Sequence, residues 1–284
     1  GNGQPVCPRD EAALSETKPK GSAVLDASGT LEARLATTPA EVEAAQRLRY
    51  DIFYREMNAK PSPEMAAAGR DFDDYDPICE HLLIVDKEDG AVIATYRLMR
   101  EYAAAKSPRG FYTAGEYDIA ALLKAREGQR ILELGRSCVR EDYRTGPTMQ
   151  LLWRALLVYV IKHDVSIMFG CASFPGTDPK AHALELSFLH HFHSAPPGET
   201  VRALPDHYVS MDMIPKDQID EAEALRALPP LVKGYIRSGA QIGDGAFIDH
   251  QFGTVDVFIY FPLANVHPRW ISHLKKKTAA GQDG

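Results

Sequence analysis

The chain has 284 residues, of which 45% are hydrophobic and 25% charged, a composition typical of folded globular proteins. Its formal net charge of −7 argues against general nucleic-acid binding, because nucleic-acid-binding surfaces are basic. No apolar run approaches the roughly 20 residues of a membrane-spanning helix, and Gly1–Pro5 lack a signal-peptide pattern. The four cysteines form no CxxC pair, so we expect a protein of the reducing cytoplasm without a metal site.

The first third of the chain predicts a strand, a helix and a long loop. Residues 1–30 lack apolar periodicity and predict a mobile tail. Leu31–Ala36 alternate as a short strand, and Pro39 then opens a helix that Thr38 caps. Asn58–Asp76 form a polar loop that ends in an acidic cluster, which predicts either a surface connection or a substrate lid.

Two strands and a helix are predicted next. His81–Asp86 and Ala91–Leu98 are strand-like and flank a Glu88-Asp89-Gly90 turn, which indicates a hairpin. Between residues 101 and 129 the pattern is weaker, with a helix expected at Ile119–Ala125.

A central strand is predicted at Ile131–Val139. Strict alternation places Glu133 and Arg136 on opposite faces. A β-bulge at Gly135 would reset the alternation and direct both side chains into one cleft, and bulges are common beside active sites. The alternative is an edge strand whose Glu133 and Arg136 are merely solvated.

The turn after this strand has the features of an anion site. Pro147 suits the first turn of a helix, and Gly146 leaves the backbone open to a ligand. Free N–H groups at a helix start attract phosphate, here beside Arg144. The segment from 97 to 162 holds twelve Lys/Arg against seven Asp/Glu, which favours the approach of an anionic partner. An ordinary strand-turn-helix connection remains the alternative.

The remaining elements complete an α/β pattern with a mixed sheet. Helices are expected at Thr148–His163, Asp178–Phe192 and Leu231–Ser238, and strands at Ser166–Phe174, His207–Ile214 and Val255–Leu263. We expect one domain over residues 31–274, followed at 275–284 by a flexible basic tail whose Lys275–Lys277 contact anionic lipid.

The order of these elements resembles the GNAT-type acyltransferases. In that family the pantetheine arm of an acyl thioester lies between two central strands that splay apart, here Ile131–Val139 and Ser166–Phe174. The set of linked motifs resembles most closely the ornithine-acyl-carrier-protein N-acyltransferases of bacterial ornithine-lipid synthesis, with acyl-homoserine-lactone synthases as a related branch. The stretches that carry this resemblance are Arg49–Phe53, Phe72–Asp76, Cys79–Leu82, Arg97-Leu98, Glu133–Val139, Lys233–Ala240 and Phe252–Asp256.

The resemblance implies a GNAT-like mixed sheet with splayed central strands, and site residues in three groups. The residues expected to be catalytic are Glu133, Arg136, Glu80 and His81. Those expected to contact the substrates are Arg49, Phe53, Asp73, Asp76, Arg97 and Ser137. Those expected to hold the phosphopantetheine arm are Val139, Arg144, Thr145, Gly146 and Thr148.

Within these groups the chemistry suggests a division of work. Glu133 is the leading candidate for the base, against a structural ion pair with Arg136. Asp73 and Asp76 are suited to a cationic amino-acid side chain, and Arg49 or Arg97 to its carboxylate. Each of these residues has an alternative as part of a salt-bridge network.

The expected activity is transfer of a 3-hydroxy fatty acyl group from acyl carrier protein to the α-amine of ornithine, without a metal or other cofactor. We expect the enzyme in the cytoplasm, peripheral on the inner membrane. Arg144–Pro147 are a poorer glycine loop than that of coenzyme A-using relatives, which favours a carrier protein as donor. Glu80 stands where ornithine acyltransferases commonly have Asp, and Met57 where a lactone synthase would have Trp. The rival hypotheses are a lactone-type synthase, an acyltransferase for another amino acid, and a non-catalytic module that binds acyl thioesters.

Overall fold

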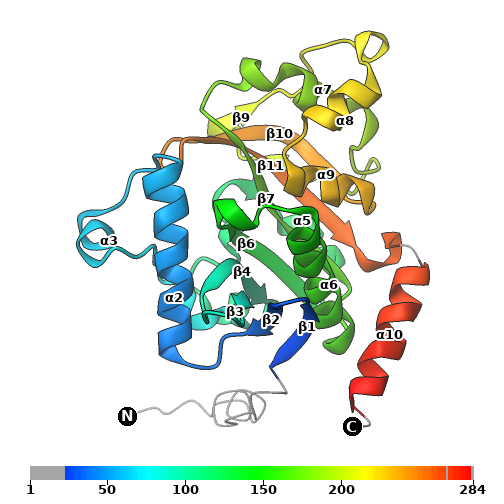
Figure 1. The fold of residues 1–284 in the computed structure, drawn as a ribbon. Helices are drawn as coiled ribbons and strands as arrows, with labels where there is room; N and C mark the ends of the chain where they lie inside the picture. The colour runs from blue at the N-terminus through cyan, green and yellow to red at the C-terminus, as the bar shows by residue number, and fades with distance from the viewer. Residues whose placement is uncertain (1–22, 267, 283–284) are drawn as a thin grey trace, which may run out of the picture.

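The computed structural model describes residues 23–266 and 268–282 (Figure 1). Its helices are α2 (Pro39–Tyr50), α3 (Pro63–Ala68), α4 (Glu101–Lys106), α5 (Ala120–Ala125), α6 (Gly146–Lys162), α7 (Ala183–Phe192), α8 (Glu221–Ala227), α9 (Pro230–Arg237) and α10 (Pro268–Gln282). Its strands are β1 (Val24–Ser28), β2 (Leu31–Leu35), β3 (Glu80–Asp86), β4 (Val92–Arg100), β5 (Tyr117–Asp118), β6 (Ile131–Val139), β7 (Ile167–Pro175), β8 (Arg202–Ala203), β9 (Tyr208–Val209), β10 (Gln241–Asp249) and β11 (Thr254–Pro262).

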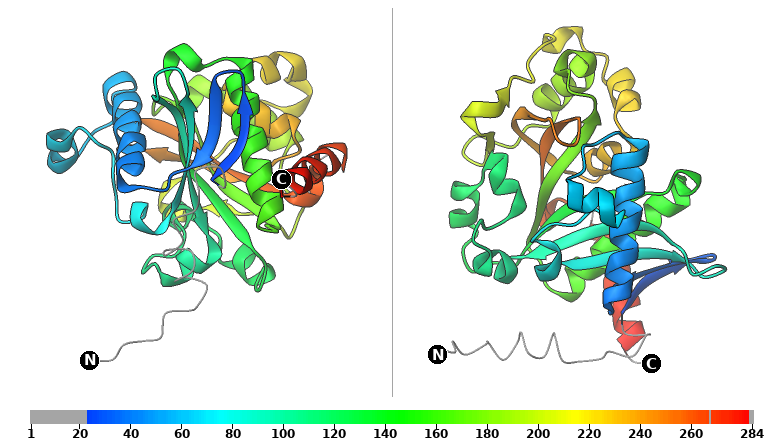
Figure 2. Two further views of the ribbon diagram at one scale, coloured as in Figure 1. Left: turned by 60° about the horizontal axis from the view of Figure 1, so that its bottom comes forward. Right: turned by 90° about the vertical axis from the view of Figure 1, so that its left-hand side faces the viewer.

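The strands form one mixed sheet in the order β1-β2-β3-β4-β6-β7-β11-β10-β8-β5. The predicted α/β class with a mixed central sheet is therefore confirmed. Helix α2 covers one face of the sheet and α6 the other, with α10 packed against α6 (Figures 1 and 2). The main hydrophobic core lies between the sheet and α6, whose buried residues include Leu151, Leu156 and Val160.

The two central strands pair and then separate, as predicted. β6 and β7 run parallel and pair from Ile131 with Ile167 to Leu134 with Gly170. At Gly170 a Cβ atom would lie 2.3 Å from the carbonyl oxygen of Leu134, so only glycine allows the strands to come this close. Beyond this pair the two strands diverge, while β7 continues to pair with β11 as far as Pro175 and Thr254.

The predicted helix starts agree with the observed caps. The Thr38 hydroxyl accepts the Glu41 N–H at 3.2 Å, and α2 begins at Pro39. Helix α6 begins two residues before the predicted Thr148, with Thr145 as its N-cap and Pro147 in its first turn. The helix expected from Asp178 is split into a 3₁₀ turn, Pro179–His182, and α7.

Both predicted tails were placed wrongly. Residues 1–22 lie outside the described residues, but Val24–Ser28 of the predicted tail form β1 and pair with β2. The short strand is stabilised by an ion pair between Asp26 and Arg154 of α6, at 3.0 Å. At the other end, Lys275 and Lys276 belong to α10, where Leu274 is buried against the core.

Two predictions in the last third were wrong in detail. The predicted strand His207–Ile214 is reduced to β9, Tyr208–Val209. The Gly-rich stretch 239–245 was not predicted as a strand, yet it enters β10, where Gly243 lets the Val201 carbonyl and the Phe258 side chain come close. In the described residues no helix is long and apolar enough to cross a lipid bilayer.

Candidate active site

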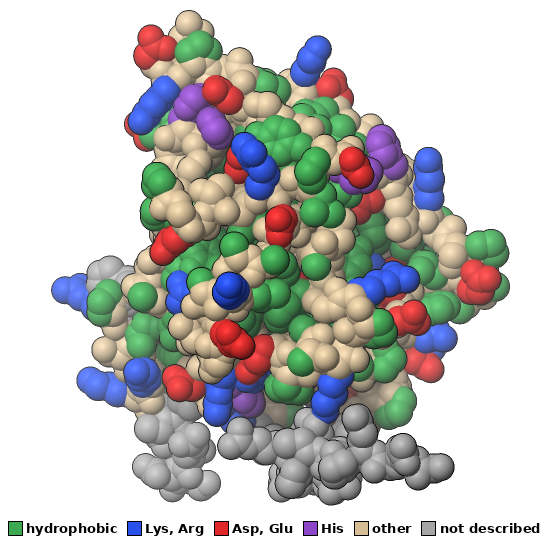
Figure 3. Space-filling model, turned by 180° about the vertical axis from the view of Figure 1, so that it is seen from behind, with side chains coloured by type: hydrophobic (Ala, Val, Ile, Leu, Met, Phe, Trp, Pro, Cys, Tyr) green, Lys and Arg blue, Asp and Glu red, His purple; other side chains and the backbone are tan. Residues whose placement is uncertain are grey.

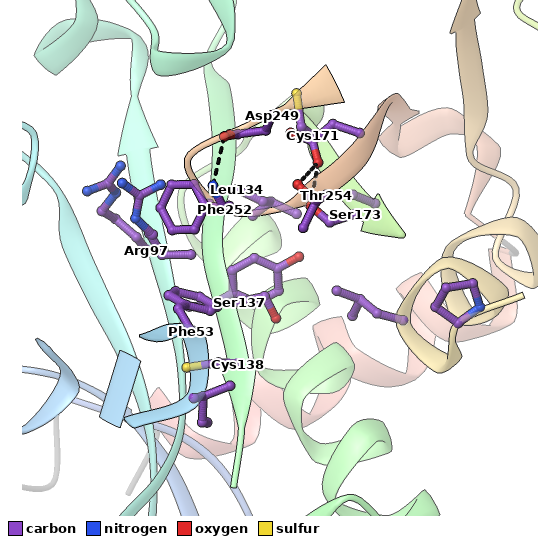
Figure 4. Close-up of a pocket in the computed structure, with 18 of the residues that line it drawn as sticks. Phe53, Arg97, Leu134, Ser137, Cys138, Cys171, Ser173, Asp249, Phe252 and Thr254 are labelled. Carbon is purple, nitrogen blue, oxygen red and sulfur yellow. Dashed lines mark hydrogen bonds between the residues drawn. The ribbon is translucent and has the colours of Figure 1, made fainter. Parts of the chain in front are cut away.

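A cavity of about 420 Å³ lies where β6 and β7 separate. β6 contributes Glu133 through Val139 to its lining, and β7 contributes Cys171, Ala172 and Ser173. In Figure 4, Ser137 and Cys138 lie toward one end of this cavity, and Asp249, Cys171, Thr254 and Ser173 are grouped at the other. The cavity is therefore elongated along β6, with chemically different ends.

Glu133 lines the cavity but does not pair with Arg136. Its side chain is 4% exposed, and its two carboxylate oxygens accept the backbone N–H groups of Tyr112 (3.1 Å) and Thr113 (2.8 Å). Burial raises the pKa of Glu133, although the Thr113 and Tyr112 N–H groups and Arg97 oppose this. A carboxylate with a raised pKa beside a cavity is suited to proton transfer near neutral pH.

The predicted bulge in β6 exists, but it is centred one residue later than Gly135. Three steps along β6, from Gly135 to Cys138, match two steps along β4, from Arg97 to Thr95. Arg136 is the residue with a positive φ, 52°. A non-glycine residue in this region is uncommon and occurs where surrounding contacts hold it.

The contacts that hold Arg136 are an ion-pair network. Its guanidinium bonds Asp71 and Asp73, both at 3.2 Å, and lies against the rings of Tyr112 and Phe252. Burial lowers the pKa of Arg136, but Tyr112, Asp71 and Asp73 outweigh burial and raise it above its ordinary value. Arg136 thus stays charged at the wall of the cavity.

Four residues predicted for substrate binding, Arg49, Arg97, Asp73 and Asp76, belong to the same network. Arg49, 1% exposed, bonds both Asp71 and Asp76 at 2.8–2.9 Å. Arg97 bonds Asp73 (2.6 Å) and Asp76 (3.1 Å). The predicted ligands of a cationic substrate, Asp73 and Asp76, therefore bond arginines of the protein, and of these predicted residues only Arg97 lines the cavity.

The Glu80-His81 pair, predicted as a second candidate for proton transfer, lies outside the cavity lining. The Tyr159 hydroxyl of α6 donates to Glu80. His81 is 3% exposed, and its Nε2 lies 3.0 Å from the Asp76 carbonyl oxygen. Burial lowers the pKa of His81, so its ring is neutral and supports the loop that ends at Asp76.

A second group of carboxylates, which the sequence did not indicate as a site, lies at the other end of the cavity. Glu116, Asp249 and Asp256 all line it, and one carboxylate oxygen of each lies within 4.8 Å of the others. Asp256 accepts from the hydroxyls of Ser173 (2.7 Å) and Thr254 (2.8 Å), both seen in Figure 4. In the part of the chain that the structure describes, no Lys or Arg forms an ion pair with these three groups.

The missing positive charge is reflected in the pKa values. Burial and the neighbouring charge of Asp256 raise the pKa of Glu116 to about 9. Burial also raises the pKa of Asp256. Because Glu116 and Asp256 are hydrogen-bonded, the pair holds a proton at neutral pH. A bound cation would replace that proton and let both groups ionise.

The wall nearer the start of α6 is mostly apolar. Phe53 lines it and packs edge-on against Phe252, with ring centroids 5.7 Å apart. Ser137 lines it too, hydrogen-bonded to the hydroxyl of Tyr96. The other apolar side chains of this wall are Ile52, Met57, Val139, Met149, Pro229, Pro230 and Leu231.

The predicted phosphopantetheine group is divided between the cavity and its border. Val139 and Arg144 line the cavity, whereas Thr145, Gly146 and Thr148 form the adjoining first turn of α6. Arg144 bonds the Val139 carbonyl (2.8 Å) and Glu56 (2.6 Å). The helix start therefore lies at the end of the cavity farther from the carboxylate group of Glu116.

The predicted basic surface is largely neutralised. Arg140 pairs with Asp142, Arg144 with Glu56 and Arg154 with Asp26. In the view of Figure 3, Lys and Arg side chains are interspersed with Asp and Glu among hydrophobic ones.

One of the three carboxylates that sequence reasoning missed left a signal in the sequence. Asp256 interrupts an otherwise apolar strand, Val255–Leu263. A single carboxylate in such a strand indicates a buried polar group and hence a candidate site residue. Glu116 lies in the stretch of weak pattern before β6, and Asp249 ends a strand that was not predicted. Neither position distinguishes itself from a surface carboxylate by sequence.

The cavity thus lies between two parallel strands that separate, with the start of α6 near one end and buried carboxylates at the other. Residues 48–154 match the family described as Acetyltransferase (GNAT) domain. The fold and the site thus define an acyltransferase of the GNAT class.

Curated relatives identify the branch within that class. The chain is 49% identical to an L-ornithine N(alpha)-acyltransferase of Brucella abortus over 88% of this chain and 90% of the relative. It is 45% identical to the enzyme of the same name from Agrobacterium fabrum, over 91% of this chain and 90% of the relative. The chain belongs to the L-ornithine N(alpha)-acyltransferase family, as the motifs predicted. A more distant solved structure is the AHL synthase LasI, with a TM-score of 0.43 and 12% identity over 83% of this chain and 91% of that one.

Proposed function

We propose that this enzyme transfers a 3-hydroxy fatty acyl group from acyl carrier protein to the α-amine of L-ornithine. The observation that carries the choice of acceptor is the group of three carboxylates, Glu116, Asp249 and Asp256, at one end of the cavity. Ornithine carries a second ammonium group at the end of its side chain, and this group supplies the positive charge that the carboxylates lack. The names of the relatives support the same substrate.

The donor thioester is proposed to lie between β6 and β7, with its acyl chain against the apolar wall. The phosphate of the carrier arm then reaches the free N–H groups at the start of α6 and the side chain of Arg144. The arm needs a single phosphate contact, which fits the plain turn Arg144–Pro147. The thioester itself is the co-substrate, and we propose no other cofactor.

The acceptor is proposed to span the polar part of the cavity. Its side-chain ammonium lies among Glu116, Asp249 and Asp256, and its carboxylate faces Arg97 and Arg136, which both line the cavity. These opposite charges fix the α-amine between them, where Glu133 also lies.

In the proposed reaction the α-amine attacks the carbonyl carbon of the thioester. A C–N bond forms, the C–S bond breaks, and the carrier thiol leaves. Glu133 takes the proton from the amine, directly or through water, and the proton passes to the leaving thiolate. Backbone N–H groups at the Arg136 bulge are proposed to polarise the carbonyl oxygen.

The membrane surface is the proposed site of action. Lys275 and Lys276 of α10 are exposed and support contact with anionic lipid headgroups. Co-sedimentation of the enzyme with anionic vesicles, and its release by salt, would test this.

An acceptor comparison tests the proposal on the purified enzyme. The acceptors are ornithine, 2-aminopentanoic acid, which lacks the side-chain amine, and putrescine, which lacks the carboxylate. With a 3-hydroxyacyl carrier protein as donor, we expect ornithine to have the highest kcat/KM and to yield the Nα-acyl product by mass spectrometry. Equal kcat/KM values for ornithine and 2-aminopentanoic acid would exclude the three carboxylates as the acceptor site. Loss of activity on adding EDTA would instead assign them to a metal ion.

A further inference from the structure

Helix α9 borders the apolar wall of the cavity and carries a buried tyrosine with no assigned role. Leu231 of α9 lines the cavity, and Tyr235 follows one turn later in the stretch Lys233–Ala240. Tyr235 is 5% exposed, and its ring packs against Trp153 of α6. The apolar contacts explain the ring but not the hydroxyl group.

The hydroxyl oxygen of Tyr235 is buried, and among the described residues no group lies within hydrogen-bonding distance of it. Native proteins pair nearly all buried polar atoms, because an unpaired one loses its hydration without compensation. The Tyr96 hydroxyl nearby, in contrast, is hydrogen-bonded to Ser137. The geometry therefore points to a polar group that Tyr235 receives from outside the chain.

A small cavity of about 20 Å³ adjoins this tyrosine, a volume that accommodates one oxygen-sized group. Three residues line both this cavity and the main one: Tyr96, Leu134 and Cys171. Its other walls are apolar and include Met168, Ile259 and Phe261. A single polar group entering from the main cavity would find Tyr235 as its partner in an otherwise apolar surrounding.

The small cavity lies beside the reaction centre rather than at the far end of an acyl chain. Leu134 follows Glu133 in β6 and faces Gly170 at the point where β6 and β7 separate. A group that reaches it must be attached close to the thioester carbonyl.

We propose that Tyr235 is a specificity-determining residue that binds a hydroxyl group carried by the acyl chain near its thioester, as in a 3-hydroxyacyl donor. The inference rests on the proposed function, in which the thioester lies between β6 and β7. The tyrosine hydroxyl donates to or accepts from the substrate hydroxyl, which leaves water at the same time. An unsubstituted chain leaves the Tyr235 hydroxyl unpaired and therefore binds less tightly.

The experiment compares a 3-hydroxyacyl carrier protein with the unsubstituted acyl carrier protein of the same length, in the wild type and in Tyr235→Phe. We expect the ratio of kcat/KM for the two donors to favour the hydroxylated one in the wild type, and to fall about tenfold in Y235F. Tyr260→Phe is the matched control. Tyr260 is equally buried, bonds Arg126 and lines neither cavity, so its substitution should leave the ratio unchanged.

Two further measurements separate the outcomes. Titration of the enzyme with each donor, in the absence of acceptor, gives the preference between the two donors as a ratio of dissociation constants. This measurement remains valid if ornithine proves not to be the acceptor. A wild type that binds both donors equally, or a Y235F variant with the wild-type ratio, would overturn the inference while leaving ornithine acylation intact. The melting temperature of the ligand-free protein tests the alternative that the Tyr235 hydroxyl binds a structural water. Y235F should melt at the same temperature as the wild type or at a higher one. A marked fall in the melting temperature, together with weaker binding of both donors, would assign the hydroxyl to a structural role.

Discussion

Two groups of three carboxylates flank the same cavity, and they differ in what neutralises them. Asp71, Asp73 and Asp76 bond three arginines, so that loop is balanced within the protein. Glu116, Asp249 and Asp256 have hydroxyl, thiol and backbone partners, and Glu116 retains its proton. A balanced group is structural, because its charges are already satisfied. An unbalanced group beside a cavity is suited to an incoming cation.

The surroundings of the two groups shift carboxyl pKa values in opposite directions. Burial raises the pKa of Asp71, but the charges of Arg136 and Arg49 outweigh it and lower the pKa. For Glu116, burial and Asp256 act together and raise the pKa to about 9. A buried carboxyl group is thus ionised in one group, at Asp71, and protonated in the other, at Glu116, at neutral pH.

The largest effect is expected at Glu133, which belongs to neither group. Glu133→Gln removes the proposed base, so kcat with ornithine should fall about 10²- to 10⁴-fold at neutral pH. Raising the pH should restore part of the rate, since the acceptor amine then loses its proton without help. The assay is kcat between pH 7 and pH 9.

Glutamine also loses one of the two N–H bonds that Glu133 accepts, so the melting temperature is the control for structure. A purely structural role would lower the rate equally at every pH. A variant with wild-type kcat at neutral pH would exclude Glu133 as the base.

Removing one arginine from the balanced group, Asp71, Asp73 and Asp76, should destabilise the folded protein. Arg49→Met leaves Asp71 and Asp76 buried with one cation fewer, and loss of one partner of a buried ion pair costs about 3–5 kcal/mol. Urea unfolding measures the loss. The control is Arg47→Ala, because Arg47 pairs with Glu43 on the exposed face of α2, where such a pair contributes about 0.5 kcal/mol or less. Equal losses in the two variants would show that the network is not structural.

Substitution in the unbalanced group should weaken the binding of ornithine. Glu116→Gln removes a charge-assisted contact to the ammonium, so KM for ornithine should rise about 10- to 100-fold. KM for 2-aminopentanoic acid should stay unchanged. Asp118→Asn, at an exposed carboxylate two residues away, is the control. An equal rise for both acceptors in E116Q would place the ammonium elsewhere.

The pH dependence of stability sharpens the same comparison. The pKa of Glu116 rises from 4.5 in the unfolded chain to about 9 in the folded protein. Its contribution to the free energy of unfolding is therefore complete below about pH 4.5 and is lost as the pH rises toward 9. E116Q should flatten this decline in urea unfolding curves measured from pH 5 to pH 9. Saturating ornithine should flatten it in the wild type.

The sequence predicted the strands and the helix around the site better than the partners of the side chains within it. Alternation, caps and the Gly-Pro turn located β6, α6 and β7, because these signals are local. The bulge was predicted from Gly135, but Arg136 adopts the positive φ, since Asp71 and Asp73, more than sixty residues away, hold its guanidinium. Asp73 and Asp76 were assigned to the substrate because the sequence does not show that Arg49 and Arg97 reach them. Glu116 and Asp256 were missed because the antiparallel pairing of β11 and a turn before β5 bring them together only in the folded chain.

The smallest effect is expected at the end of the cavity remote from both groups. Arg144→Ala should raise KM for the carrier-protein donor about two- to fivefold, because an exposed charge contact contributes about 0.5–1 kcal/mol. It should also reduce the dependence of that KM on salt, while KM for ornithine stays unchanged. Arg154→Ala is the control. Arg154 lies on α6, roughly 12 Å along the helix from its start, and pairs with Asp26, so it contributes only to the general field of the surface. A similar rise in both variants would show that the donor is attracted by overall charge and that Arg144 has no contact of its own with the carrier arm.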